Sequence, residues 1–313
     1  MDSYNAQAEI YEEGQYMLTF KPLQLSDRSV VEPILRSVDS KSCDYSFANN
    51  LIWTKPNNIQ FAIVDGFYCL KSTWKAGAVY TNPVGTGDRS EVIEALIADA
   101  KQAGIPFLLR GLLVDDVAEL NRLFPDRFEI TENRDQFDYI YKVEDLVNLT
   151  GKKYAAKRNH ISRFLDNPDW AYEHITQQNI GECAEMNDKW CQLHGCGDDP
   201  GLKKEMCAVR TALKQFFELR FAGGLLRLNG EVVAFTIGEP LSSDTYNVHI
   251  EKAFSDIQGA YQMINRQFLI HNCQSFTYVN REEDMGDEGL RKVKLSYRPE
   301  ILLEKYTAKL VKE

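Results

Sequence analysis

The sequence predicts an α/β protein that contains two similar units in tandem. Two tight-turn pairs, Asp65-Gly66 and Asn229-Gly230, each lie between short runs of β-branched and apolar residues, which is typical of a β-hairpin. After each hairpin the apolar pattern gives the same order of strand, helix, strand, helix and strand. We therefore predict one domain at 1–145 and a second at 146–313, each a mixed sheet flanked by helices.

The first half combines amphipathic helices with short strands around its hairpin. In the helices, apolar residues recur at helical spacing. In the strands, they alternate with polar residues or follow one another directly. The expected helices are 26–38, 46–53, 90–104 and 114–124, and the expected strands are 59–64, 67–71, 79–81, 105–109, 128–131 and 137–143.

The second half starts with a basic helical stretch and then follows the same order. Its hairpin is the strongest turn signal in the chain. The expected helices are 146–167, 180–194, 202–221 and 261–270, and the expected strands are 169–175, 225–228, 231–237, 245–251 and 276–279.

Composition and charge narrow the class of protein. With 313 residues, 44% hydrophobic and 26% charged, the chain resembles an ordinary globular protein. A net charge of −10 argues against broad nucleic-acid binding, which needs a basic face, but leaves room for a local basic groove. No apolar run approaches the ~20 residues of a membrane span, and scattered cysteines suit a reducing cytoplasm. Cys191, His194 and Cys196 lack a second ligand pair, so we expect no metal site.

The stretch 276–299 carries the densest concentration of acids and bases. A short strand at 276–279 runs directly into five polar residues at the point where it should end, namely Asn280, Arg281, Glu282, Glu283 and Asp284. Polar groups at the carboxyl end of a strand are a common way to build a site in α/β proteins. A charged surface loop is the alternative.

A glycine turn and a row of cations complete this stretch. Asp287 is placed to cap a short helix that carries Leu290 and Val293 inward, and residues 295–297 alternate as a last strand would. The cations Arg291, Lys292, Lys294 and Arg298 follow the turn. We expect them to meet an anionic ligand.

A second candidate lies where the strand 245–251 gives way to a helix. The turn residues are Gln258, Gly259, Ala260 and Tyr261. A helix start presents free N–H groups and the positive end of the helix dipole, which suits a phosphate. Relief of a tight turn by Gly259 is the other interpretation.

This order of elements resembles the GNAT acyltransferase fold. In that family the third strand separates from its neighbour and the following turn holds the pyrophosphate of the donor. The family turn is usually Arg/Gln-x-x-Gly-x-Gly/Ala, and Asp256-Ile-Gln-Gly-Ala-Tyr261 matches it only in part, which argues against ordinary acetyl-CoA binding.

Three segments carry a more specific resemblance. They are GKKYAAKRNHISRF at 151–164, HIEKAF at 249–254 and YVNREEDMGDEGLRKVKLSYRP at 278–299. Together they resemble the catalytic domain of phosphatidylglycerol lysyltransferases, and especially its soluble bacterial relatives, over about residues 20–310. The resemblance implies tandem GNAT-like domains that move an aminoacyl group from a charged tRNA to an amine or hydroxyl. No counterpart of the family's membrane-spanning half is present, which argues against a lipid acceptor.

An aminoacyl transfer needs a base, a cation for the developing oxyanion and a phosphate clamp. Under this resemblance Lys292 and Lys294 are expected at the oxyanion and the terminal phosphate, and Glu251 is the candidate base. The remaining candidates are Arg281 and Arg291 for phosphate, Glu283 and Asp284 for the donor's amino group, Asn280 as an orienting amide, and Lys157, Arg158 and Arg163 for a polyanion. The alternative for Arg281 and Arg291 is a salt-bridge network within the protein, with Glu283 and Asp284 as its acids. The alternative for Lys292 and Lys294 is a solvated strand face, that for the three basic residues at 157–163 is an exposed helix face, and that for Asn280 is a turn at the end of the strand.

Two functions follow from the sequence. The first is a cytoplasmic acyl- or aminoacyl-transferase without a tightly bound cofactor, with acyl-CoA or aminoacyl-tRNA as co-substrate and with tRNA as its one nucleic-acid partner. The second is a ligand-binding or regulatory module on the same fold, since a fold does not dictate an activity. The donor, the acceptor and the oligomeric state are left open.

Overall fold

The computed structural model describes residues 10–11, 15–16, 18–75 and 77–312. The chain forms two compact units. Unit 1 comprises Met1–Phe137 and Leu303–Glu313, and unit 2 comprises Asp138–Leu302.

Unit 1 is a mixed sheet with helices packed on it. Its strands are β3 (Lys21–Pro22), β4 (Ile59–Val64), β5 (Phe67–Trp74), β6 (Gly77–Thr81), β7 (Leu108–Leu112), β8 (Phe128–Glu132) and β16 (Tyr306–Leu310), and β1 (Ile10–Tyr11) pairs separately with β2 (Gln15–Tyr16). Its helices are α1 (Arg28–Ser37), α2 (Phe47–Ile52), α3 (Thr54–Asn57), α4 (Arg89–Gln102) and α5 (Val114–Leu123), with 3-10 turns η1 (Leu25–Asp27), η2 (Cys43–Tyr45) and η3 (Arg134–Gln136).

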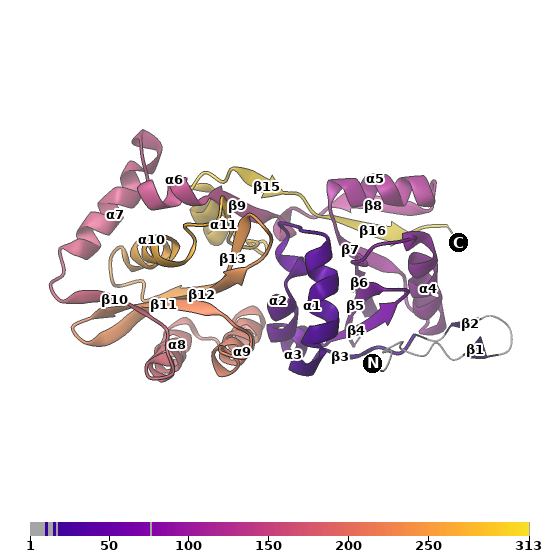
Figure 1. Cartoon of the computed structure of the whole chain (residues 1–313), viewed down its shortest axis with the longest axis horizontal. Coiled ribbons are helices and arrows are strands. Elements are labelled where there is room, and N and C mark those ends of the chain that lie inside the picture. Colours follow the sequence, from indigo (N-terminus) through magenta and orange to yellow (C-terminus); the bar gives the residue numbers. More distant parts are fainter. Residues whose placement is uncertain (1–9, 12–14, 17, 76, 313) are drawn as a thin grey trace. The chain divides into compact units, whose positions relative to one another are not determined.

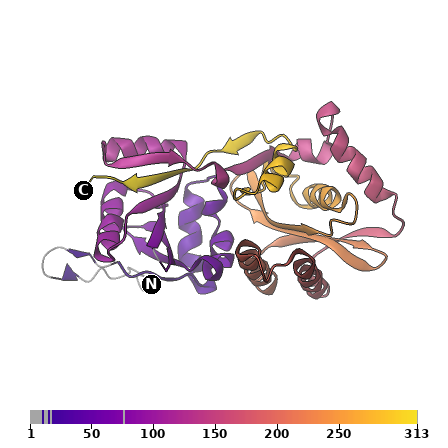
Figure 2. The same ribbon diagram turned by 180° about the vertical axis from the view of Figure 1, so that it is seen from behind.

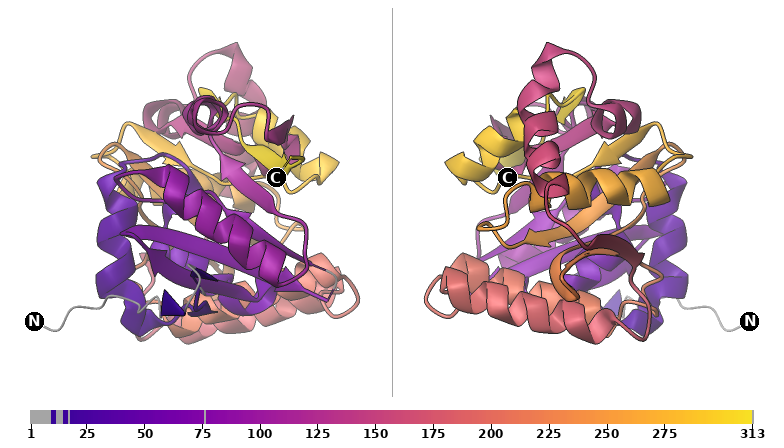
Figure 3. Two further views of the ribbon diagram at one scale, coloured as in Figure 1. Left: turned by 90° about the vertical axis from the view of Figure 1, so that its right-hand side faces the viewer. Right: turned by 90° about the vertical axis from the view of Figure 1, so that its left-hand side faces the viewer.

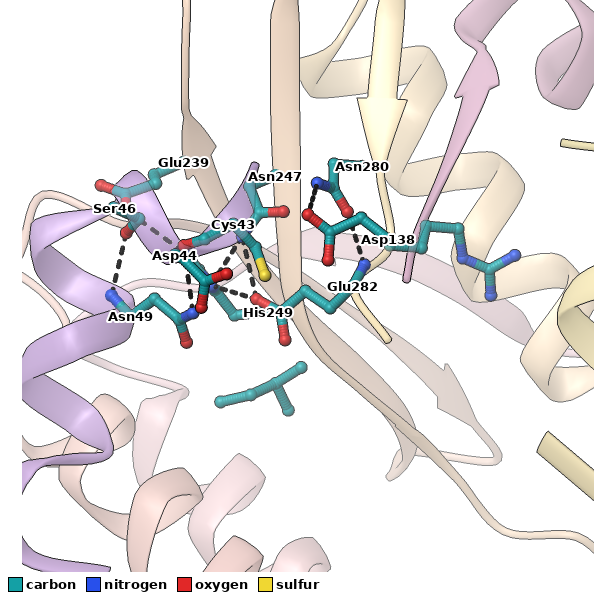
Figure 4. Close-up of polar contacts among 12 residues, drawn as sticks. Cys43, Asp44, Ser46, Asn49, Asp138, Glu239, Asn247, His249, Asn280 and Glu282 are labelled. Carbon is teal, nitrogen blue, oxygen red and sulfur yellow. Dashed lines mark hydrogen bonds and ion pairs between the residues drawn. The ribbon is translucent and has the colours of Figure 1, made fainter. Parts of the chain in front are cut away.

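The sheet of unit 1 has the order β3-β4-β5-β6-β7-β16-β8. Its core is formed by α4 residues such as Ile93 and Leu96 against strand residues such as Tyr80 and Leu109, all essentially buried. Helix α2 begins where Ser46 accepts a hydrogen bond from the Asn49 N–H at 2.9 Å, the usual N-cap arrangement (Figure 4).

Unit 2 is a second mixed sheet with the order β10-β11-β12-β13-β14-β9-β15. Its strands are β9 (Asp138–Lys142), β10 (Trp170–His174), β11 (Ala222–Leu228), β12 (Glu231–Pro240), β13 (Thr245–Ala253), β14 (Tyr278–Asn280) and β15 (Ile301–Leu303). Its helices are α6 (Val143–Asn148), α7 (Ala155–Leu165), α8 (Ile180–His194), α9 (Pro200–Lys214), α10 (Ala260–Asn272) and α11 (Glu288–Leu295), with η4 (Lys152–Tyr154) before α7.

The helices of unit 2 cover both faces of its sheet. Helix α10 lies on one face together with α7, and α8 and α9 lie on the other (Figures 1 and 3). Phe268 and Leu269 of α10 pack against Tyr246 and Val248 of β13, and Ile264 packs nearer the hairpin. This burial of aromatic and branched side chains fixes β13 and α10 against each other, which matters for the site.

The two predicted hairpins are confirmed. Asp65 and Gly66 have φ of 48° and 80°, and Asn229 and Gly230 have φ of 50° and 85°. Two successive residues with positive φ define the turn that best matches the twist of paired strands. Both turns lie between antiparallel strands of the predicted type, β4–β5 and β11–β12.

The ends of the two units differ from the division predicted at 145. β9 joins the sheet of unit 2, where it pairs with β14, and β16 returns to unit 1 and inserts between β7 and β8. The yellow strand β16 lies among the purple strands of unit 1 in Figures 1 and 2. Each sheet is therefore completed by a strand from the other half of the sequence, which local periodicity does not reveal.

The predicted last strand at 295–297 is wrong. Helix α11 extends to Leu295, and Ser296 has helical φ and ψ at its C-terminal cap. The expectation that Leu290 and Val293 face inward is also wrong, because they are 41% and 47% exposed. The predicted cap is confirmed, since the Asp287 carboxylate accepts from the Leu290 N–H at 2.6 Å.

Candidate functional site

The strands β13 and β14 separate part-way along their length. They pair in parallel through Thr245 with Tyr278, Tyr246 with Val279 and Asn247 with Asn280. β14 ends at Asn280, whereas β13 continues to Ala253. The second half of β13 is therefore unpaired on this side within the described residues, which leaves a gap in the sheet of unit 2.

Unit 1 contains the corresponding parallel pair without the same separation. β6 and β7 pair through Tyr80 with Leu109 and Thr81 with Arg110, so the pairing reaches the last residue of β6. The Asn82 N–H then donates to the Arg110 carbonyl at 2.8 Å and extends the contact. The gap in unit 2 is therefore the better candidate for a site.

A β-bulge at His249 marks the start of the gap. Ile237 pairs with Ile250 and Gly238 with Val248, so His249 is the extra residue of β13. Its Nδ1 lies 2.8 Å from the Glu282 carboxylate and its Nε2 lies 3.2 Å from Glu239 (Figure 4). Burial alone would lower the pKa of His249, but the hydrogen bonds to Glu239 and Glu282 raise it to about 9. The imidazole is consequently a buried cation at neutral pH.

Arg281 bridges the gap. Its Nη2 donates to Glu251 of β13 at 2.8 Å, and the other oxygen of Glu251 accepts from Asn265 of α10 at 2.9 Å. Both oxygens of the predicted base Glu251 are thus held by donors of the protein. This arrangement gives Glu251 the task of positioning Arg281.

The Arg281 guanidinium is held between two tyrosine rings. It lies 4.8 Å from the ring centroid of Tyr297 and 5.7 Å from that of Tyr141, distances typical of cation–π contacts. The side chain is 9% exposed, and its Nη1 is buried with no hydrogen-bond partner among the residues that the structure describes. An unpaired buried N–H is costly, so Nη1 is the unsatisfied donor of this part of the molecule.

Lys157 of α7 reaches the same tyrosine. Its Nζ lies 3.8 Å from the ring centroid of Tyr297 and donates to Ser296 Oγ at 2.6 Å. Lys157 is 9% exposed, and burial, followed by the nearby Arg281 charge, lowers its pKa to about 8. A fraction of this amine is therefore unprotonated near neutral pH.

Lys294, a predicted catalytic residue, is buried beneath the loop that follows β14. Its Nζ donates to the backbone carbonyls of Arg281 at 2.7 Å and Glu282 at 3.1 Å, and also to that of Glu283. Burial and the Arg281 charge lower the pKa of Lys294. These contacts commit the ammonium to shaping the loop that presents Arg281.

Asp284 is fully buried and also shapes this loop. It accepts from Arg291 at 2.8 Å and 2.9 Å, from the Tyr139 hydroxyl at 2.5 Å and from the Gly286 N–H at 2.9 Å. Burial alone would raise the pKa of Asp284, but the hydrogen bonds from Arg291, Tyr139 and Gly286 hold it below its usual range. The predicted residues Asp284 and Arg291 therefore form an ion pair in which the carboxylate is buried and the guanidinium is partly exposed.

The other predicted residues of the loop lie at different depths. Asn280 is fully buried; its amide donates to Asp138 at 3.0 Å and accepts from the Glu282 N–H at 2.7 Å (Figure 4). Asn280 thus orients the turn after β14. Glu283 is half-buried, and Lys292 is exposed on α11.

The predicted phosphate turn has the expected helix start, but α7 packs against it. Gly259 has φ of 84° and immediately precedes α10, with Gln258 exposed and Ala260 and Tyr261 in the first turn. A Cβ at Gly259 would lie 2.0 Å from the His160 carbonyl oxygen. Glycine is thus required both by the backbone conformation and by the close approach of α7.

The basic residues of α7 that the sequence assigned to a polyanion do not share one surface. Lys157 points inward, whereas Arg158 is exposed and donates to the carbonyl of Gly151 at 2.8 Å and to that of Leu149. Arg163 is exposed. The helix therefore contributes one buried amine to the site.

Sequence reasoning missed four groups that complete the site: Tyr141, Asn265, Ser296 and Tyr297. The alternating pattern at 295–297 predicts that Tyr297 lies in a strand, whereas Tyr297 follows helix α11. No local pattern marks it as a residue of the site. Asn265 lies among apolar residues of α10, where a buried amide resembles any polar residue of a helix. Tyr141 is only one of several aromatic residues in and around β9.

The comparison with protein families identifies the chain. A family model described as Phosphatidylglycerol lysyltransferase, C-terminal, matches residues 35–309. The chain belongs to this family. This confirms the resemblance drawn from the three sequence segments, and the fold is that of two GNAT-like units in tandem, of the kind that acyl- and aminoacyl-transferases share.

Similar proteins support the same fold. A crystal structure of a protein of unknown function from Bacteroides thetaiotaomicron is 42% identical, with a TM-score of 0.89 and coverage of 94% of this chain and 100% of that one. The structure of L-PGS from Bacillus licheniformis is 15% identical, with a TM-score of 0.63 and 92% of each chain covered. An uncharacterised protein of Mycoplasmoides gallisepticum is 24% identical over 186 residues, and the chain spans 56% of its length.

No helix in the described part of the chain has the length and apolar character that a membrane crossing requires.

Proposed function

We propose that unit 2 transfers an acyl or aminoacyl group from an activated donor to an amine or hydroxyl. The observation that carries this proposal is the gap between β13 and β14, bridged by the Arg281–Glu251 pair, with a buried guanidinium N–H that has no partner among the described residues. Membership of the lysyltransferase family supports the reaction class.

The packing of α7 supports an aminoacyl-tRNA rather than a CoA thioester as donor. A CoA pyrophosphate would need the open N–H groups at the start of α10. The His160 carbonyl lies against Gly259 at this place, and the turn carries Asp256, whose charge repels phosphate. An ester at the 3′ end of a tRNA does not require that cradle.

Each residue around the gap has a separate role in the proposed transfer. Arg281 Nη1 donates to the carbonyl oxygen that gains negative charge during transfer, and Glu251 and Asn265 hold the guanidinium in place. Lys157 accepts a proton in its neutral form and returns it to the leaving group. The rings of Tyr141 and Tyr297 exclude water around the guanidinium, which strengthens its interaction with a developing charge.

A binding module without turnover is the second candidate. The observation that favours it is the occupation of both Glu251 oxygens by Arg281 and Asn265, because it removes the base that the sequence predicted and leaves Lys157 as the one candidate named for that role. In that case the gap would hold a carbonyl ligand without transferring it.

A donor-consumption assay separates the two candidates. The full chain is incubated with radiolabelled aminoacyl-tRNA or with acetyl-CoA, in the presence of simple amines and glycerol-containing hydroxyl acceptors. The transferase proposal predicts loss of the aminoacyl ester above its spontaneous hydrolysis, with label in the acceptor. Thermal stabilisation by the donor without label transfer would support the binding module. Both donors are cytoplasmic, so the proposal places the reaction there.

A further inference from the structure

Lys157 and Ser296 form a hydrogen bond between a buried amine and the hydroxyl of an exposed serine. Ser296 lies at the C-terminal cap of α11 and is exposed, whereas Lys157 comes from α7 and is 9% exposed. Lys157 Nζ donates to Ser296 Oγ at 2.6 Å, and the hydroxyl donates to the Val293 carbonyl at 2.5 Å. An exposed serine thus contacts a buried amine.

Lys157 and Ser296 lie close to the Arg281 guanidinium. Lys157 Nζ and the Arg281 guanidinium contact the ring of Tyr297 at 3.8 Å and 4.8 Å, and Tyr297 directly follows Ser296 in the chain. A nucleophile, a base and a donor for an oxyanion are therefore gathered around one ring. These are the three parts that nucleophilic acyl transfer requires.

We propose that Ser296 is the covalent nucleophile of the transfer, with Lys157 as its base, so that the reaction passes through an acyl-serine ester. This inference rests on the proposed function and specifies how the acyl group is carried. Neither the serine nor a covalent step follows from the acid–base loop alone.

The two half-reactions balance. In the first, the Ser296 hydroxyl turns from the Val293 carbonyl toward neutral Lys157, which takes its proton. Oγ then forms a bond to the carbonyl carbon of the donor ester or thioester. The bond from that carbon to the donor oxygen or sulfur breaks, and the leaving group takes the proton from Lys157. In the second, the acceptor nitrogen or oxygen forms a bond to the acyl carbon and gives its proton to Lys157. The bond from that carbon to Ser296 Oγ breaks, and Oγ takes the proton from Lys157, which restores the serine.

The burial of Lys157 supports this role over a purely structural one. A charged ammonium that is 9% exposed and has no carboxylate at hydrogen-bond distance in the described part of the chain loses solvation without the compensation of an ion pair. An apolar side chain at this place would bind α7 to α11 at less cost. Burial favours the neutral amine, which is the form that a base must have.

The experiment traps the ester directly. The full chain is mixed with p-nitrophenyl acetate and, separately, with radiolabelled aminoacyl-tRNA, quenched in acid within milliseconds to seconds, and analysed by intact mass and peptide mapping. Ser296→Ala and Lys157→Met are compared with Ser162→Ala, a control at an exposed serine of α7. We expect a stoichiometric burst and an acyl group on the peptide that contains Ser296, at least 10-fold less in both test variants and unchanged in the control.

Different results overturn the inference and leave the proposed function standing. If the wild-type chain transfers label to an acceptor but carries no acyl group on Ser296 with either donor, transfer is direct and the inference is wrong. Equal transfer rates in Ser296→Ala and the wild type would also show that no acyl-serine lies on the reaction path. The proposed function fails separately, if neither the wild type nor Ser296→Ala transfers label to any acceptor. An acyl-serine formed without such transfer would still support Ser296 as a nucleophile.

Discussion

Arg281 donates to Glu251 at 2.8 Å across the place where β13 and β14 part, so an ion pair spans the gap that the sheet leaves open. Both side chains are largely buried, 9% and 14% exposed. Removing one member of such a pair leaves an uncompensated charge, which is more destabilising than removing both.

A double-mutant cycle tests this pair. We expect Arg281→Met to lower the free energy of unfolding by about 3 kcal/mol, and Arg281→Met with Glu251→Gln to recover part of the loss. Urea denaturation of the wild type, both single variants and the double variant gives the coupling energy. The same cycle on Arg210 and Asp188, an ion pair with side chains 55% and 51% exposed, should give less than about 1 kcal/mol. Equal coupling in the two cycles would contradict the burial argument.

Lys294 stabilises the loop that follows β14. Its ammonium serves three backbone carbonyls, so Lys294→Met should leave them unpaired and lower the free energy of unfolding by about 3 kcal/mol. Lys292→Met, two residues earlier and exposed, should change it by less than about 0.5 kcal/mol. Thermal and urea unfolding of both variants measure the difference. A Lys294→Met protein as stable as the wild type would show that the ammonium is held for a ligand instead, as the sequence suggested.

His249 makes stability depend on pH. Its pKa is about 9 when folded, above the ordinary value of 6.5, so the folded chain holds a proton that the unfolded chain releases between these values. The stabilisation is complete below pH 6.5 and is lost as the pH rises through 9, in total on the order of 3 kcal/mol.

Urea unfolding from pH 6 to 10 measures this dependence. The free energy of unfolding should fall with rising pH in the wild type, and His249→Gln should flatten the curve in this window. His160→Gln, at a partly exposed histidine of α7, should keep the wild-type slope. An unchanged slope in His249→Gln would show that other groups cause the pH dependence.

Gly259 holds α7 against the start of α10. Gly259→Ala forces a Cβ to within 2.0 Å of the His160 carbonyl, in addition to the strain of φ at 84°. Gly230→Ala provides the matched control, because its φ is 85° and nothing lies within 4 Å of its Cβ. We expect the control to lose about 1 kcal/mol and Gly259→Ala to lose at least about 2 kcal/mol more, by urea denaturation. Equal losses would mean that α7 moves aside freely.

Local signals predicted the elements that short-range chemistry determines. The two hairpins follow from residues that accept positive φ, and the start of α11 follows from the capping side chain of Asp287. The family resemblance also came from contiguous segments. The exchange of β9 and β16 between the two sheets depends on pairing between strands far apart in sequence, which no local pattern encodes.

The sequence predicted individual residues of the candidate site but not the contacts between them. Arg281, Glu251 and Lys157 each stand out in the sequence as charged residues near strand or helix ends. Their roles depend on partners distant in the chain, such as Asn265 for Glu251 and Ser296 for Lys157. Lys294 carries the same charge as Lys292, and only the course of α11 turns the first inward and the second toward solvent.

The most direct test of the central claim is the transfer rate of Arg281→Lys. Lysine keeps a positive charge beside Glu251 but lacks a second nitrogen in the place of Nη1, to which we assign the carbonyl oxygen of the donor. With donor and acceptor from the consumption assay, well below the melting temperature of the variant, we predict a rate at least about 100-fold lower than that of the wild type. Arg163→Lys, on the exposed face of α7, should transfer at the wild-type rate. An Arg281→Lys protein that transfers as fast as the wild type would contradict the placement of the chemistry in the gap between β13 and β14.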